Sequence, residues 1–153
     1  MGFKESVEET PNLQGKWMPG LGALRPQDKA RIDPENTSTV HLRGSVDVDT
    51  AWAALDPGGN RWDFAIGYKH QNRSDEFIYW VETHTGADDQ IAVMSRKLTW
   101  LKTWLTGAGR KQSLTGYSSG CQAEQHHFIK VPLKSENWRT KEYYTQAPGF
   151  EFR

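Results

Sequence analysis

The chain has 153 residues, and Lys plus Arg and Asp plus Glu both total 19, so its formal net charge is zero. This length suits one domain. Because the overall charge is neutral, it gives no support to polyanion binding, and any basic site must be local. No run approaches the roughly 20 apolar residues of a membrane helix, and the amino end lacks the apolar core of a secretory signal. Since the lone Cys121 excludes an intrachain disulfide, we expect a cytoplasmic protein without a membrane partner.

Residues 1–38 are rich in Pro and Gly and lack sustained periodicity, which predicts an irregular amino-terminal arm. Residues 39–153 are predicted to form a single domain. From Thr39 onward, Val40 and Leu42 alternate with polar residues, as in a half-buried strand that Gly44 ends or bends. The arm carries apolar side chains of its own, so we expect part of it to dock on this domain.

Two helices are predicted within the domain. The segment AWAAL at 51–55, which follows the potential caps Ser45, Asp47 and Asp49, predicts a short helix. A long amphipathic helix is predicted from about Asp89 to Leu105. Its apolar stripe consists of Ile91, Met94, Leu98, Leu101 and Leu105. A neighbouring stripe consists of Val93, Lys97, Trp100 and Trp104.

The clearest strand pattern is a predicted antiparallel hairpin. The segments RWDFAIGY at 61–68 and EFIYWVETH at 76–84 read as strands, and the run between them is polar and rich in turn residues. If Asn72 and Arg73 occupy the centre of the turn, the position numbers of each cross-strand pair sum to 145. That register places Asp63 directly opposite Glu82.

These elements predict an α+β fold, or an α/β fold, with a small mixed sheet. The antiparallel hairpin forms part of that sheet and the long amphipathic helix packs on it. The segment HHFIKVPL at 126–133 predicts one more strand, which Pro132 makes an edge strand or ends.

The first candidate site consists of Asp63, Glu82 and His84. Side chains two apart on a strand face the same side, so Glu82 and His84 are predicted neighbours that Asp63 joins from the adjacent strand. Two carboxylates held together repel unless a cation lies between them, and Mg²⁺ or Mn²⁺ bound there would hold a water able to attack a phosphodiester. The alternative is that both acids pair with Arg61, His84 or Arg43 on a solvated sheet face.

The order of a short helix, a strand with Asp63, a strand with VETH at 81–84 and a long helix resembles the restriction-endonuclease-like superfamily, known for its PD-(D/E)xK motif. The resemblance covers about residues 45–133. It implies that Asp63 and Glu82 are metal ligands and that His84 is a degenerate third member of the motif. Trp62 stands where the motif has Pro, and His84 stands where it has the Lys that orients or activates the water. The resemblance therefore implies low cleavage activity at best.

A local positive stretch is a candidate nucleic-acid contact. Its members are Arg96, Lys97, Lys102, Arg110 and Lys111, with no acid between them. Together with Trp100 and Trp104 they suit a phosphate backbone and unpaired bases. The alternative is that the cations complement the helix dipole while the Trp residues pack in the core.

Two functions follow from these patterns. The first is a nuclease-like domain that hydrolyses phosphodiesters with Mg²⁺ or Mn²⁺, or that only binds nucleic acid. The second is a non-catalytic α+β module for protein interaction or a small ligand, in which aromatic side chains line a cleft or a homodimer face. The exposure and separation of the Asp63 and Glu82 carboxylates would discriminate between them.

Overall fold

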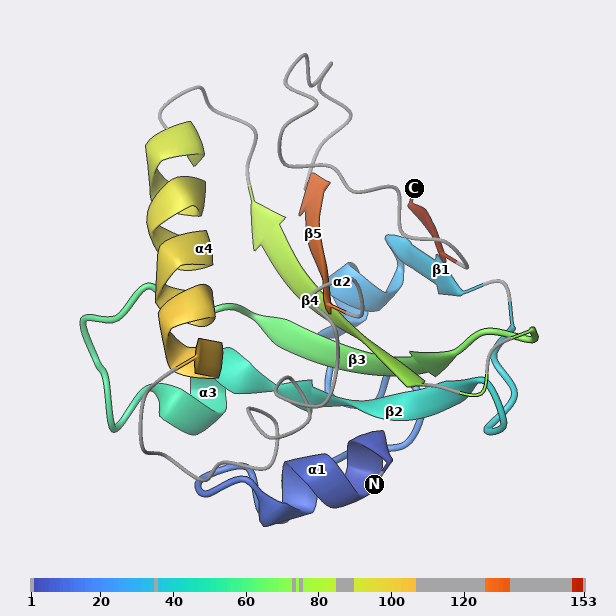
Figure 1. The fold of residues 1–153 in the computed structure, drawn as a ribbon. Helices are drawn as coiled ribbons and strands as arrows, with labels where there is room; N and C mark the ends of the chain where they lie inside the picture. The colour runs from blue at the N-terminus through green and yellow to red at the C-terminus, as the bar shows by residue number, and fades with distance from the viewer. Residues whose placement is uncertain are drawn as a thin grey trace.

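A computed structural model describes residues 2–34, 36–72, 74, 76–84, 90–106, 126–132 and 150–152. These residues form four helices and six strands (Figure 1). The helices are α1 (Phe3–Glu9), α2 (Pro26–Lys29), α3 (Val48–Trp52) and α4 (Gln90–Thr106). The strands are β1 (Ile32–Pro34), β2 (Leu42–Asp47), β3 (Phe64–Lys69), β4 (Glu76–His84), β5 (His126–Pro132) and β6 (Phe150–Phe152).

The central sheet has four strands in the order β2-β3-β4-β5. The β2–β3 and β3–β4 pairs are antiparallel, whereas β5 runs parallel to β4 along the edge and ends at Pro132. A separate antiparallel pair joins β1 to β6, which are far apart in the sequence. The chain is therefore an α+β protein with a small mixed sheet, as predicted.

The β3–β4 hairpin has the register that the sequence predicts. Phe64 pairs with Val81 and Lys69 with Glu76, so the position numbers of each pair sum to 145. A short polar connection between two strands leaves few alternative registers, because a slip by one residue would exchange the two faces. Asp63 and Glu82 consequently lie next to each other beyond the last paired rung.

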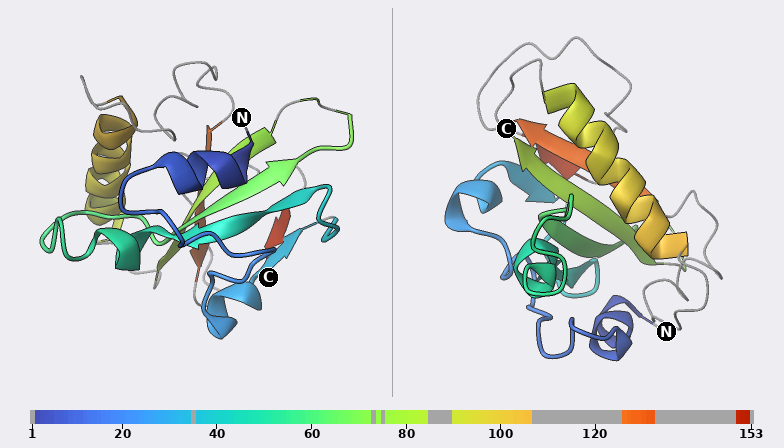
Figure 2. Two further views of the ribbon diagram at one scale, coloured as in Figure 1. Left: turned by 90° about the horizontal axis from the view of Figure 1, so that it is seen from below. Right: turned by 90° about the vertical axis from the view of Figure 1, so that its left-hand side faces the viewer.

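The two faces of the sheet carry separate apolar clusters. One cluster joins the sheet to α1, α3 and α4 through Phe3, Val7, Leu13, Val46, Val48, Trp52, Trp62, Ala65, Ile78, Trp80 and Leu101. The other joins the opposite face to β1 and the segment before α2 through Leu24, Ile32, Leu42, Phe64, Ile66, Tyr68, Phe77, Tyr79 and Val81. The right-hand view of Figure 2 shows α4 on one side of the sheet and α2 with β1 on the other. The sheet is thus the middle layer of three.

Helix α4 packs on the sheet close to where the sequence places it. Leu101 is fully buried and Leu98 packs half-buried against the same cluster. Trp100 and Trp104, from the neighbouring stripe, also pack there. Ile91, Met94 and Leu105 lie outside the described side chains. The buried face of α4 therefore draws on both predicted stripes.

The amino-terminal arm is more regular than predicted, because it contains α1, α2 and β1. Phe3 and Val7 of α1 are fully buried, as is Leu13 after the helix. A helix of seven residues offers only two turns of pattern, which is too short for its periodicity to be recognised. Burial against the sheet, rather than helix propensity, accounts for α1.

Strand β2 begins at Leu42 rather than at Thr39, and Val40 is 60% exposed. Gly44 bends the strand without ending it: its φ is +123° and the pairing with β3 shifts between Leu42 and Gly44. The indole of Trp17 lies against Gly44 and donates a hydrogen bond to the Arg43 carbonyl at 3.1 Å. A side chain at position 44 would collide with that ring.

Replacing Leu101 with Ala should lower the free energy of unfolding by about 2 to 5 kcal/mol, because the change leaves a cavity beneath α4. Val40→Ala, at an exposed position, should change it by less than about 0.5 kcal/mol. Urea denaturation measures both variants. Equal stabilities would show that α4 does not pack on the sheet.

Replacing Gly67 with Ala should loosen α1, because the added methyl would overlap the ring of Phe3. Backbone amides of α1 should then exchange with solvent faster than those of β4, which hydrogen exchange measured by mass spectrometry detects. Gly58→Ala is the control, because a methyl at Gly58 meets no atom within 4 Å. Unchanged protection of α1 in Gly67→Ala would contradict this packing.

Candidate functional site

Asp63 lies at the junction of α3 and β3, where its backbone holds two elements together. Its carbonyl oxygen accepts hydrogen bonds from the backbone nitrogens of Val48 at 2.9 Å and Asp49 at 3.3 Å, both in the first turn of α3. Of the three predicted caps, Asp47 is the one that the structure uses, since its carboxylate accepts from the Thr50 nitrogen at 2.8 Å. These bonds fix the backbone position from which the Asp63 side chain projects.

The Asp63 carboxylate turns towards the last residues of β4. Its Oδ2 atom accepts hydrogen bonds from the backbone nitrogen of Thr83 at 2.9 Å and from the Thr83 hydroxyl at 2.7 Å. The Nη2 atom of Arg25 lies 3.7 Å from the same oxygen. The Oδ1 atom accepts no hydrogen bond from the described part of the chain, and the side chain is 15% exposed. Asp63 therefore keeps one oxygen available.

Glu82 is a buried carboxylate with a cation as its partner. Its side chain is 1% exposed, and its Oε1 atom forms an ion pair with the ammonium group of Lys97 from α4. Its Oε2 atom accepts a hydrogen bond from the Asp63 backbone nitrogen at 3.2 Å. The Trp62 indole donates to the Lys97 carbonyl at 2.8 Å, which ties α4 to the start of the hairpin. Glu82 thus links β4, the Asp63 backbone and α4.

The hairpin brings Asp63 and Glu82 together, but their carboxylates turn to different partners. Glu82 belongs to the face of β4 that carries Trp80 and meets α4, whereas Thr83 belongs to the opposite face. Within the described ranges, no group of three or more His, Cys, Asp or Glu side chains could hold a metal ion. A divalent ion at this position would need water as well as protein oxygens to complete its coordination.

Arg25, in the arm immediately before α2, joins the site from the other side of the sheet. Its Nε atom bonds the Asp28 carboxylate at 2.6 Å, and its Nη2 atom bonds the Thr83 hydroxyl at 3.1 Å. Its guanidinium lies over the Phe64 ring, 5.5 Å from the centroid. The hydrogen bond and charge of Asp28, helped by the charges of Asp63 and Asp47, raise the pKa of Arg25 above its usual value against the opposing effect of burial. Arg25 therefore remains a cation in a negative field.

The predicted pairing of the two acids with Arg61 or Arg43 is wrong. Arg61 pairs with Asp49 at 2.9 Å, and Arg43 pairs with Glu76 at 2.7 Å. Asp63 and Glu82 instead meet Arg25 and Lys97, which come from the arm and from α4. The 1% exposure of Glu82 also contradicts the solvated sheet face on which that alternative depended.

The structure describes the other predicted site residues only in part. His84 ends β4 opposite Pro132 of β5, and its side chain lies outside the described residues. In the positive stretch, Arg96 is exposed, whereas Lys97 is engaged by Glu82. The Lys102 side chain, Arg110 and Lys111 lie outside the part of the chain that is described.

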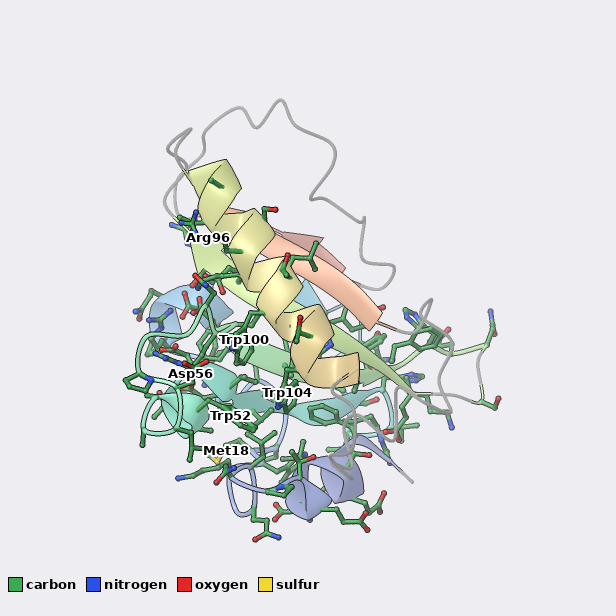
Figure 3. All side chains as sticks on the ribbon, turned by 60° about the vertical axis from the view of Figure 1, so that its left-hand side comes forward. Met18, Trp52, Asp56, Arg96, Trp100 and Trp104 are labelled. Carbon is green, nitrogen blue, oxygen red and sulfur yellow. The ribbon has the colours of Figure 1, made fainter. Side chains whose placement is uncertain are left out.

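The aromatic residues of α4 mostly serve the core, as the structural alternative predicted. Trp104 packs edge to face on Trp52 and Trp80, with ring centroids 5.2 and 5.9 Å apart. Trp100 lies nearly parallel to Trp104, and its indole donates to the Asp56 carboxylate at 2.9 Å. Figure 3 shows Trp52, Trp100 and Trp104 gathered where α4 meets α3. Trp104 is therefore partly buried and packs against the core.

Sequence reasoning missed Lys97 as the partner of Glu82, although one signal was present. Lys97 shares its predicted stripe with Trp100 and Trp104, and a cation on a helix face that meets a sheet needs a buried anion. Arg25, Asp28 and Thr83 left no such signal. Their roles depend on where the arm crosses the sheet, which local pattern does not specify.

Comparison of the chain with protein-family models, curated proteins and solved structures finds no match in any of the three. None of the described helices is long and apolar enough to cross a bilayer.

Removing the Lys97 charge should leave Glu82 buried without a counter-ion. Lys97→Met should lower the free energy of unfolding by about 3 to 5 kcal/mol. Adding Glu82→Gln should recover much of that loss, because the amide keeps an acceptor for the Asp63 nitrogen without a charge. Urea denaturation of the wild type, both single variants and the double variant measures the coupling. Additive effects would show that the pair is not a buried ion pair.

Proposed function

We propose that the chain is a weak metal-dependent phosphodiesterase of nucleic acid, with its site at Asp63, Glu82 and Lys97. The observation that carries the proposal is the ammonium group of Lys97 on the Glu82 carboxylate, directly beside Asp63. Two acids and a lysine are the residue types that the predicted nuclease motif requires. The lysine comes from α4, whereas position 84 of the hairpin holds His.

Asp63 would be the principal ligand, because its Oδ1 atom accepts no hydrogen bond from the described residues and its side chain is partly exposed. Mg²⁺ commonly binds proteins through one or two carboxylates and keeps several waters, so the scarcity of protein ligands suits it. Glu82 would contribute an oxygen or hold a metal-bound water. Mn²⁺ fits the same oxygen ligands.

Lys97 would act on the water or on the phosphate. Its ammonium group supplies three donors and a positive charge at the Glu82 carboxylate, and it would stabilise the negative charge that develops as a phosphodiester is attacked. A metal at Asp63 would bind the attacking water and lower its pKa. Arg96, exposed one residue earlier on α4, is a cation for the substrate backbone.

The non-catalytic module remains the second candidate, and one observation favours it. The charge of Glu82 is already neutralised by Lys97, and its side chain is 1% exposed, so a metal has to compete with an existing ion pair. In that case the same residues would serve only to hold α4 against the sheet.

Purified protein with Mn²⁺ should nick supercoiled plasmid or cleave single-stranded RNA slowly. Asp63→Asn and Lys97→Met should each lower the rate by about 10²-fold or more if the residues act as proposed. Asp49→Asn and Lys69→Met are the matched controls. Asp49 is a nearby surface acid paired with Arg61, and Lys69 lies at the far end of β3.

Circular dichroism should show which variants remain folded, since Lys97→Met is expected to lose stability. Equal cleavage by the wild type and all variants would mean a contaminating nuclease. A wild type that cleaves neither DNA nor RNA with Mg²⁺ or Mn²⁺ would overturn the proposal and leave the non-catalytic module.

A further inference from the structure

Arg25 lies between two carboxylates that share an unusual feature. The Oδ2 atom of Asp28 accepts a hydrogen bond from the Arg25 guanidinium at 2.6 Å. The Oδ2 atom of Asp63 accepts one from the Thr83 hydroxyl, and Arg25 lies 3.7 Å from it. The other oxygen of each, Oδ1, accepts no hydrogen bond from the described residues. One guanidinium therefore stands between two carboxylates that are each only half satisfied.

Of the two carboxylates next to Arg25, Asp28 is the fully buried one, with a buried oxygen, Oδ1, that has no partner in the described part of the chain. A buried carboxylate oxygen without a partner is unfavourable, because it has lost its hydration and gained nothing in return. Asp28 lies in the first turn of α2, and its pairing with Arg25 satisfies one of its two oxygens. The second oxygen is the one that a further ligand would satisfy.

The charges around Arg25 favour a cation. Asp28 and Asp63 together carry two negative charges against the single charge of Arg25. The Thr83 hydroxyl, 3.1 Å from Nη2 and 2.7 Å from the Asp63 Oδ2 atom, adds a neutral oxygen. Carboxylate and hydroxyl oxygens are the ligands that a hard divalent cation prefers, with water filling the remaining positions.

We propose that Asp28 and Asp63 form a divalent-cation site that Arg25 occupies in the metal-free protein. Arg25 is able to leave, because its side chain is 53% exposed and is anchored only through its charged end and its contact with Phe64. When Mg²⁺ or Mn²⁺ binds, Arg25 turns into solvent and Asp28 contributes a ligand from the arm. This inference rests on the proposed function in one respect, the use of Asp63 as a metal ligand.

Arg25→Ala should bind Mn²⁺ about tenfold more tightly than the wild type, if Arg25 holds the site for about nine-tenths of the time. Isothermal titration calorimetry with MnCl₂ measures the affinity. Adding Asp28→Asn to Arg25→Ala should abolish the gain. No gain in Arg25→Ala, or a gain that persists with Asp28→Asn, would overturn the site.

The matched control is Arg43→Ala, which removes the cation from a different carboxylate, that of Glu76. Arg43 is 39% exposed and pairs with Glu76, which is 12% exposed, at 2.7 Å. If Arg43→Ala gains Mn²⁺ affinity to the same degree, any released acid binds the ion and the proposed site is not specific. If Arg25→Ala does not fold, Arg25→Lys replaces it. A lysine keeps the charge and loses the fork that spans Asp28 and Thr83, so its Mn²⁺ affinity should still exceed that of the wild type.

The two proposals fail separately. Asp28-dependent Mn²⁺ binding without cleavage by any variant would overturn the phosphodiesterase and keep the cation site. Metal-dependent cleavage by the wild type, with equal Mn²⁺ affinity in the wild type and Arg25→Ala, would keep the phosphodiesterase and overturn the role of Arg25.

Discussion

The pairing of β3 with β4 is the constraint on which the other layers depend. Its register directs Ala65 and Trp80 towards α4 and directs Ile66 and Tyr79 towards β1. Each face then needs an apolar cover, which α1, α3 and α4 supply on one side and the segment around α2 and β1 on the other. A slip by one residue would exchange both faces, so the whole three-layer arrangement follows from a single pairing.

The same hairpin concentrates charge at one end of the sheet. Glu82 and Asp28 are both nearly inaccessible to solvent, and each is neutralised by a cation from a separate segment: Lys97 from α4 and Arg25 from the arm. Buried ion pairs contribute little net stability compared with apolar replacements, although breaking one is costly. Both pairs lie around the partly exposed Asp63, where the proposed cation site would use them.

Lys97 and Arg25 approach this end of the sheet from opposite faces. Lys97 holds Glu82 on the α4 face, while Arg25 reaches Asp63 and Thr83 from the α2 face. Under the proposal, a divalent ion would compete first with Arg25, because Arg25 is the more exposed of the two cations. The proposed cation site would therefore link ion binding to the packing of the arm and to the orientation of Asp63.

Much of the fold followed from local pattern. The hairpin register, the approximate limits of α4, the edge position of β5 and the α+β class were all predicted, because alternation and turn residues are encoded over a few neighbouring positions. Helix α1 was missed because seven residues carry too little periodicity. The closeness of Asp63 to Glu82 was predicted as well, since it needs only the register of adjacent strands.

The directions of the charged groups could not be predicted in this way. The backbone of Asp63 caps α3, which turns its carboxylate to Thr83, and this bond exists only once α3 is folded against the hairpin. Arg25 reaches Thr83 across 58 positions of sequence, and Lys97 reaches Glu82 across 15. The sequence by itself determined the β3–β4 hairpin, its register and the place where Asp63 and Glu82 meet. Only the tertiary structure decided which cation faces each acid, because that choice depends on how the arm and α4 cross the sheet.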